Sequence, residues 1–251
     1  MNYPMADLLG LRVHMLGVGG FVEQIEQFVE NGQTAQVVTL NAEISEAASK
    51  NKSLTDIINR AQLVTPDGIS IIWALKQLGY APGERVTGID LLYALCQAGS
   101  RHAWKVFLLG AAPGVAERAA ANLLHTYPGL KIAGTHSGFF SAEEEAHLVA
   151  TIAAAQPDLV FVGMGAPKQE FWLDKYLPQL PPCVGMGVGG SFDVVSGMKK
   201  RAPAWTIKLN IEWLYRLLAE PSRLKRQMVL PRFMWRIKRS ARHRRRQSSG
   251  S

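Results

Sequence analysis

The stretch "KVFLLGAAPGVAERAAANLLHT", residues 105–126, decides the fold class. Its first six residues form an apolar run of the length of a buried strand, and the segment from Pro113 onward has the spacing of a helix. The residues "GAAPG" between them are typical of a tight turn, with the proline in the first helical turn. The stretch therefore predicts a strand, a turn and a helix in succession.

The same succession is repeated along the chain. Apolar runs predict further strands at 11–16, 36–40, 62–66, 130–134, 158–163 and 183–188. Helix-like segments are expected at 20–31, 42–50, 68–78, 91–99, 142–155 and 168–176. Short apolar strands that alternate with helices are typical of a parallel sheet. We therefore expect an α/β fold over residues 1–204, with a Rossmann-like, mostly parallel sheet flanked by helices.

The C-terminal part of the chain has a different pattern. From Trp205 the sequence reads as helical, with interruptions at Pro221 and Pro231. Residues 221–251 hold eleven Lys and Arg and no Asp or Glu, so the first 220 residues carry −3 although the whole chain has a formal charge of +8. We expect a basic helical appendage that associates with membranes at 205–246 and a disordered tail at 247–251.

Composition narrows the class of protein. A hydrophobic content of 47% and a charged content of 19% describe a globular chain. Cys96 and Cys183 lie far apart and have no metal-ligand spacing, which favours a reducing cytoplasm. The N-terminus lacks the basic region of a signal peptide, and the apolar runs are too short to span a bilayer. The expected location is cytoplasmic, with peripheral attachment to the inner face of the membrane.

Polar or glycine-rich turns follow the predicted strands. They are "TLNAE" (39–43), "TPDG" (65–68), "LGAAPG" (109–114), "VGMGAPKQE" (162–170) and "GVGGSFD" (187–193). In an open parallel sheet, ligands bind outside the carboxyl ends of the strands. Because all these turns belong to that edge, the sequence predicts one shared binding crevice there.

Each candidate residue also has an ordinary structural explanation. Asp67 stands between a strand and a helix, so it is either the N-cap of that helix or a catalytic base. The turn at Gly110 suits a phosphate at a helix N-terminus but also fits an ordinary β–α turn. Arg85 reads equally as a solvated loop residue, and the cluster around Gln169 as a set of helix caps. These alternatives stay open at the level of single motifs.

Several familiar motifs are missing from the sequence. No Gly-Lys-Ser/Thr follows the glycine-rich turns, and no full dinucleotide fingerprint is present, so a P-loop enzyme and a dehydrogenase are disfavoured. The histidines have no metal-ligand spacing, and no G-x-S-x-G nucleophile turn occurs. We therefore expect neither a metal nor a cofactor.

In order along residues 35–235, seven segments resemble the WecG/TagA/CpsF family of bacterial glycosyltransferases (glycosyltransferase family 26). They are "TLNAEISEAASKN", "TPDGISIIWALKQLG", "RVTGIDLLYALC", "GAAPGVAERAAANL", "DLVFVGMGAPKQEFW", "GVGGSFDVVSGMKKRAPAW" and "IEWLYRLLAEPSRLKRQ". The chain departs from the family at Ala42, where proline is usual, and at Asn210, where glycine is common. Neither departure removes a chemical group.

The resemblance implies an inverting, metal-independent transfer of a sugar from a UDP-sugar to a polyprenyl-diphosphate-linked acceptor, in the biosynthesis of cell-surface polysaccharide such as exopolysaccharide. N-acetylmannosamine or its uronate is the expected sugar, with glucose or another hexose as the alternative. Asp67 matches the general base of the family. The residues matched to substrate binding are Thr39, Asn41, Arg85, Gly110, Gln169, Asp193, Arg216, Arg223 and Arg226.

Two other classes of function compete with this one. The basic tail suits a nucleic-acid binder, but its interleaved apolar residues, such as Phe233 and Trp235, favour an anionic membrane surface instead. We therefore expect no nucleic acid as a partner. A non-catalytic scaffold would not need polar groups in five turns of one sheet edge. The sequence leaves a homo-oligomer open.

Overall fold

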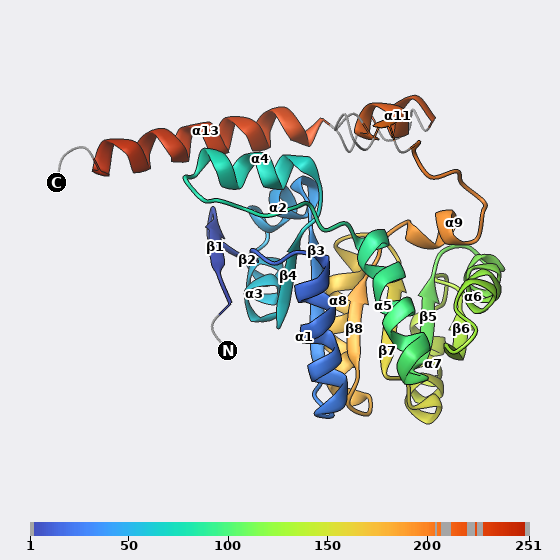
Figure 1. Ribbon diagram of the computed structural model, residues 1–251. Helices are drawn as coiled ribbons and strands as arrows, with labels where there is room; N and C mark the ends of the chain where they lie inside the picture. Colours follow the sequence, from blue (N-terminus) through green and yellow to red (C-terminus); the bar gives the residue numbers. More distant parts are fainter. Residues whose placement is uncertain (1–2, 204, 207–211, 220–223, 225–227, 249–251) are drawn as a thin grey trace.

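The computed structural model describes residues 3–203, 205–206, 212–219, 224 and 228–248. Its centre is a six-stranded sheet in which all neighbouring strands run parallel (Figure 1). The order across the sheet is β4 (Leu63–Pro66), β3 (Ala35–Leu40), β8 (Val184–Gly187), β7 (Leu159–Gly163), β5 (Lys105–Gly110) and β6 (Lys131–His136). The predicted α/β fold with a mostly parallel sheet is therefore confirmed.

Side chains that alternate along the strands build an apolar core on each face of the sheet. In β5, Val106 and Leu108 join one cluster, and Phe107 and Leu109 join the other. The first cluster includes α1 (Val18–Glu30), α5 (Gly88–His102), α6 (Val115–Thr126) and α9 (Ser191–Val195). The second includes α7 (Ala142–Ala155), α8 (Lys168–Tyr176) and the 3₁₀ turn η1 (Leu177–Gln179). Burial on both faces explains why the strands are almost continuously apolar.

The first predicted strand belongs to a separate hairpin, which corrects the expectation that it enters the main sheet. β1 (Met5–Leu8) pairs antiparallel with β2 (Leu11–His14) in a two-stranded sheet. The turn between them places Leu9 and Gly10 at φ 55° and 89°. Two residues with positive φ suit the twist of a two-residue hairpin turn. Leucine is not a residue that indicates such a turn, so the sequence does not predict the hairpin.

A third apolar cluster joins the hairpin to β3 and β4 through short helices. These helices are α2 (Ala42–Ala48), α3 (Lys52–Arg60) and α4 (Ile69–Gln77). The sequence patterns predicted α2 and α4 but overlooked α3. Asn51 starts α3, because its side chain accepts a hydrogen bond from the Leu54 N–H at 3.2 Å.

The basic tail contributes α11 (Glu212–Ala219) and α13 (Val229–Ser248), and α13 lies across α4 and α2 (Figure 1). Pro231 does not interrupt α13, because it lies in the first turn, where a proline is tolerated. The helix runs to Ser248, so residues 247 and 248 of the expected disordered tail are helical. Pro221 and residues 249–251 lie outside the described residues, and the domain boundary at residue 204 stays a prediction.

One face of α13 is part of the third apolar cluster. Phe233, Ile237 and Ala241 follow each other at intervals of four residues and are buried against the hairpin, α2 and α4. Glu46 of α2 is 2% exposed and accepts a hydrogen bond from Arg236 at 2.6 Å. At the other end of α13, Arg244 pairs with Asp7 at 2.7 Å. This helix is therefore packed into the body of the protein and is not a detached arm.

Candidate active site

The polar turns predicted from the sequence meet at the carboxyl edge of the main sheet. Strand register places Thr39 beside Thr65, Val162 beside Gly187, and Gly110 beside Gly163. The ends of five neighbouring strands are thus level with one another. This register places the turns at one edge of the sheet, as the sequence predicts. The roles of individual residues in binding and catalysis stay predictions.

Asp67 does not cap the helix that follows it. The N-cap position of α4 belongs to Gly68, which has φ 103° and no side chain to accept a hydrogen bond. Instead, Oδ2 of Asp67 accepts a hydrogen bond from the Gly88 N–H at 3.3 Å, at the start of α5. A helix N-terminus favours a negative charge. The capping explanation is therefore wrong for α4, and the carboxylate is directed toward α5.

Gly68 gives the turn at Asp67 its shape. A side chain at φ 103° would be strained, so this position requires glycine. The Asp67 N–H donates to the Leu40 carbonyl oxygen at 2.8 Å, which ties the turn to the end of β3. Asp67 is thus held on a rigid turn between two strand ends, as a positioned base must be.

Thr39 and Asn41 have structural partners of their own. The Thr39 Oγ1 donates to the Gly187 carbonyl oxygen at 3.0 Å and joins the ends of β3 and β8. The Asn41 Oδ1 accepts from the Ile44 N–H at 3.0 Å and caps α2. The structure brings both residues to the predicted edge, where Gly88 also packs against Thr39.

Arg85 lies in the loop that leads into α5 and is half-buried. The Thr87 side chain caps α5 by accepting from the Asp90 N–H at 3.2 Å, and its hydroxyl donates to Asp90 at 2.6 Å. Arg201, from the loop after α9, pairs with Asp90. These contacts hold the start of α5 beside Asp67, so Arg85 and Asp67 reach the same end of the sheet.

Gln169 and Glu170 form a buried polar pair at the start of α8. They are 2% and 1% exposed, and the Gln169 Nε2 donates to the Glu170 Oε1 at 2.9 Å. The Gln169 Oε1 accepts from the Gly189 N–H at 3.0 Å, beyond the end of β8. Burial raises the pKa of the Glu170 carboxyl above its ordinary range. The pair is therefore more than the surface cap cluster that the sequence allowed.

The glycine-rich turn after β5 is held close to β7. Gly110 has φ 142°, and a Cβ there would lie 2.5 Å from the backbone of Gly163, so glycine is required. The Ala111 N–H donates to the Gly163 carbonyl oxygen at 2.9 Å. Because that amide is used inside the protein, a phosphate at this turn would have to bind the amides that open α6. The N-cap of α6 is Gly114, which has no side chain to occupy them.

Asp193 lies next to this edge, and the three tail arginines lie wholly or partly outside the described part of the chain. Asp193 lies in α9, directly after β8, and pairs with Lys199 at 2.7 Å. Arg216 belongs to α11, but its side chain is outside what the structure describes. Arg223 and Arg226 lie outside the described residues altogether. The structure therefore brings Thr39, Asn41, Asp67, Arg85, Gly110 and Gln169 to one edge, with Asp193 on the helix next to it.

Two residues of this edge were not assigned from the sequence. Glu170 is the last residue of the turn 162–170, and an acidic residue in the first helical turn after a buried strand is the signal that indicates it. Arg201 gave no signal, since its partner Asp90 is 111 residues away.

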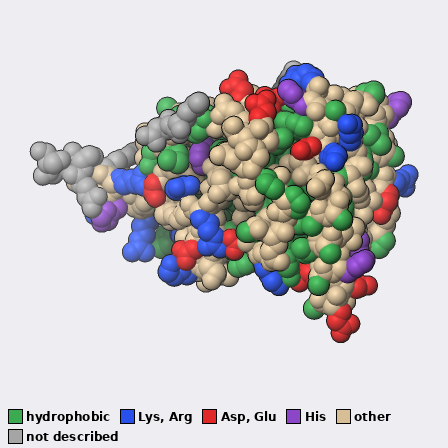
Figure 2. Space-filling model, turned by 90° about the horizontal axis from the view of Figure 1, so that it is seen from below, with side chains coloured by type: hydrophobic (Ala, Val, Ile, Leu, Met, Phe, Trp, Pro, Cys, Tyr) green, Lys and Arg blue, Asp and Glu red, His purple; other side chains and the backbone are tan. Residues whose placement is uncertain are grey.

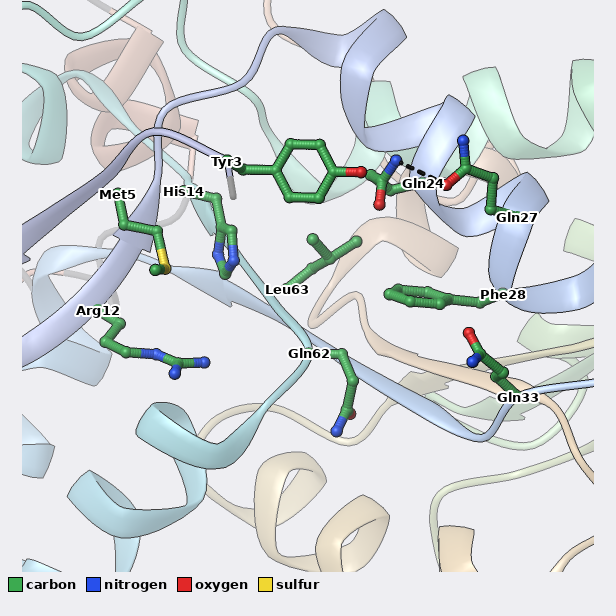
Figure 3. A pocket seen from close by; sticks show the side chains of 10 residues that line it. All are labelled: Tyr3, Met5, Arg12, His14, Gln24, Gln27, Phe28, Gln33, Gln62 and Leu63. Atoms are coloured by element: carbon green, nitrogen blue, oxygen red, sulfur yellow. Dashed lines mark hydrogen bonds between the residues drawn. The ribbon is translucent and has the colours of Figure 1, made fainter. Parts of the chain in front are cut away.

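A cavity of about 410 Å³ lies at the opposite edge of the sheet (Figure 3). Leu63 at the start of β4, Phe28 of α1 and His14 of β2 line it. It is therefore remote from Asp67, which follows the other end of β4. Among the described residues, no cluster of three His, Cys, Asp or Glu side chains could hold a metal ion.

Comparison with known proteins gives consistent matches over nearly the whole chain. Residues 6–247 match the model of the glycosyl transferase WecG/TagA/CpsF family. A Staphylococcus aureus protein is 37% identical over 96% of this chain and 95% of its own. Proteins of Bacillus spizizenii and Bacillus subtilis are 36% and 34% identical, over 85% of this chain and 83% of theirs. All three are named N-acetylglucosaminyldiphosphoundecaprenol N-acetyl-beta-D-mannosaminyltransferase.

Proposed function

Since the chain belongs to the WecG/TagA/CpsF family of glycosyl transferases, we propose that it transfers N-acetylmannosamine from a UDP-sugar to N-acetylglucosaminyl-diphospho-undecaprenol. The observation that supports this activity is the match to relatives of that name over 96% of the chain. The position of Asp67, Arg85 and Gln169 at one sheet edge agrees with it. The uronate of the same sugar, and glucose, are the donors to test against it.

The proposed reaction is a single displacement with inversion at the donor sugar. Asp67 takes the proton from the acceptor hydroxyl while that oxygen forms a bond to the anomeric carbon. The bond from this carbon to UDP breaks, and UDP leaves with the electron pair. Asp67 suits this role because its turn is fixed by β3 and because its carboxylate is held by a hydrogen bond from the first amide of α5.

The leaving UDP needs positive groups near its growing negative charge. Arg85, in the loop that leads into α5, reaches the same end of the sheet as Asp67, and charge-assisted hydrogen bonds to diphosphate are strong. The tail arginines 216, 223 and 226 are proposed to add to it. Gln169, Thr39 and Asn41 are proposed to contact the sugar and diphosphate.

The test is a panel of UDP-sugars with a short-chain diphospho-lipid acceptor, read by mass spectrometry. We expect transfer of N-acetylmannosamine at the highest rate, and Asp67→Asn should reduce turnover by about 10²–10⁴-fold. The matched control is Asp56→Asn, on the exposed surface of α3, which should keep full turnover. Transfer of none of the sugars would refute the proposed function, and an active Asp67→Asn enzyme would refute only the base.

We further propose that α13 holds the enzyme against an anionic membrane surface. Its outward face carries Trp235, which is 59% exposed, and the cations Lys238, Arg239, Arg242 and Arg246. Within the described part of the chain, none of these four cations pairs with a carboxylate, and Arg239 lies over the Trp235 ring at 5.4 Å. In Figure 2, which is seen from below, Lys and Arg side chains are visible at the left of the molecule, where the C-terminal end of α13 projects.

The structure reduces the number of tail charges available to a membrane. Arg232 and Arg236 face Glu46, and Arg244 faces Asp7, so these three cations serve the packing of α13. Among the described residues no helix is long and apolar enough to span a bilayer. Each basic residue near an anionic leaflet is worth about 1 kcal/mol, so four such residues and a tryptophan support reversible attachment.

Vesicle cosedimentation tests the attachment without disturbing the fold. Replacing Lys238, Arg239, Arg242 and Arg246 by glutamine should release the protein from vesicles of anionic lipid. The control replaces four exposed cations near the opposite edge of the sheet, Arg101, Lys105, Lys131 and Lys175, and should stay bound. Equal binding of both variants would show that α13 is not the attachment surface.

A further inference from the structure

Glu170 is the most deeply buried carboxyl group beside the proposed site, and the proposed reaction gives it no role. It is 1% exposed, and among the described residues its Oε2 has no hydrogen-bond partner. An unpaired polar atom in the interior costs free energy, so a carboxyl group at this position destabilises the fold unless it has another role. The contacts of Oε1 indicate what the group does.

The side-chain amide of Gln169 is held from both ends. Its oxygen accepts from the Gly189 N–H at 3.0 Å, and its nitrogen donates to the Glu170 Oε1 at 2.9 Å. An amide can turn over and exchange its donor and acceptor, but the Gly189 N–H can only donate, so the amide oxygen must face Gly189 and the amide nitrogen must face Glu170. Gly189 offers a donor and Glu170 offers an acceptor, so only one orientation satisfies both.

The end of β8 leaves room for this arrangement. A Cβ at Gly187 would lie 2.5 Å from the Gln169 Nε2, so the amide lies directly against the backbone there. The carbonyl oxygen of Gly187 accepts from Thr39 Oγ1, which places Gln169 and Thr39 on the same residue of β8. The backbone of Glu170 is fixed as well, because its carbonyl oxygen accepts from the Gln36 Nε2 at 3.2 Å.

We propose that Glu170 is a positioning residue that locks the Gln169 amide with its nitrogen toward the substrate. Gln169 then contacts the UDP-sugar only by donating a hydrogen bond to it. Within the described chain, the second N–H of Gln169 makes no other hydrogen bond. This N–H would therefore bind an acceptor oxygen of the substrate, such as an oxygen of the diphosphate or the carbonyl oxygen of an N-acetyl group. It would not accept a hydrogen bond from a sugar hydroxyl. This inference rests on the proposed function for its substrate.

The burial of Glu170 agrees with this role. Loss of contact with water raises the pKa of the carboxyl, which favours its neutral form. A neutral carboxyl group still offers a carbonyl oxygen to Gln169 but leaves no uncompensated charge in the interior. Glutamine at position 170 offers the same acceptor oxygen with the same shape.

The experiment compares Glu170→Gln with Glu170→Leu in the transferase assay. We expect E170Q to keep the wild-type KM for the UDP-sugar, and E170L to raise that KM by about tenfold with a smaller change in kcat, since a misdirected hydrogen bond weakens binding by roughly this factor. Calorimetry should show the same loss in the affinity of E170L for UDP-sugar. If E170L does not fold by circular dichroism, E170M replaces it, because a flexible apolar chain fits the same space.

A double-mutant cycle separates positioning from a general effect on the fold. If Glu170 acts through Gln169, then adding E170L to Gln169→Ala should not raise the KM further. The proposal is overturned if E170L keeps the wild-type KM, if E170Q is impaired as much as E170L, or if the two substitutions are additive. An enzyme that transfers sugar while showing any of these results refutes the role of Glu170 alone.

Discussion

Phe233→Ala tests whether α13 belongs to the folded body of the enzyme. Phe233 is fully buried in the cluster that contains the β1–β2 hairpin, α2 and α4. Trp235 is two residues away on the same helix, is aromatic as well, and is 59% exposed. The pair therefore forms a matched comparison in which burial is the main difference.

The expected magnitude follows from the burial of each ring. Removal of a buried phenylalanine ring costs about 3–5 kcal/mol, from lost transfer free energy and the cavity left behind. For a chain of 251 residues this corresponds to a fall in Tm of roughly 6–20 °C. Trp235→Ala removes mostly exposed area, so the free energy of unfolding should change by no more than about 0.5 kcal/mol.

Thermal unfolding and limited proteolysis measure the two possible responses to Phe233→Ala. Where α13 stays docked until the body unfolds, the full loss appears in Tm. Where α13 detaches first, trypsin cleaves its arginines at a temperature at which the wild type resists cleavage. Trp235→Ala should match the wild type in both assays and lose affinity for anionic vesicles. Identical Tm values and identical cleavage for Phe233→Ala and the wild type would refute the packing of α13.

Three further predictions concern the sheet edge. Burial raises the pKa of Glu170 in the folded protein above 4.5, its ordinary value in the unfolded chain. Above pH 4.5 the unfolded chain therefore loses a proton that the folded protein still holds. The free energy of unfolding should fall by up to about 1.4 kcal/mol per pH unit until the folded group also ionises. Urea titrations should show this slope in the wild type and not in E170Q, and equal slopes would contradict a buried neutral carboxyl. Arg85→Ala should raise the KM for UDP-sugar more than Gln169→Ala does, because the arginine contact is charge-assisted, and steady-state kinetics with the reverse order would count against Arg85 as the diphosphate contact. Transfer should persist in EDTA, and a loss of activity that Mg²⁺ or Mn²⁺ restores would overturn the metal-independent reaction.

The sequence by itself determined the elements of the sheet and the edge at which the polar groups meet. Apolar runs such as 105–110 and helical spacing such as 142–155 are local properties, and the structure reproduces both spans. Parallel strands bring the turns that follow them to one edge, so Thr39, Asp67 and Gln169 could be assigned to the same crevice without any knowledge of strand order.

Only the tertiary structure decided which partner each of these residues has. Asp67 stands in a position that is typical of a helix cap, yet its carboxylate contacts Gly88, 21 residues further on. In the sequence, Glu170 is an ordinary acidic residue in the first turn of a helix. In the structure, the packing of α8 buries it. Long-range contacts of this kind depend on how whole elements pack, and local preferences carry no information about them.

The tail shows the same division between local and long-range information. Its composition predicted a basic helix, and in the sequence Phe233 and Trp235 have the same aromatic character. Packing against α2 and α4 buries the first and leaves the second exposed, and Glu46 pairs with both Arg232 and Arg236, the latter 190 residues away in the sequence. A helix has a fixed spacing that its sequence reveals, but the face that becomes buried is set by the surface on which it packs.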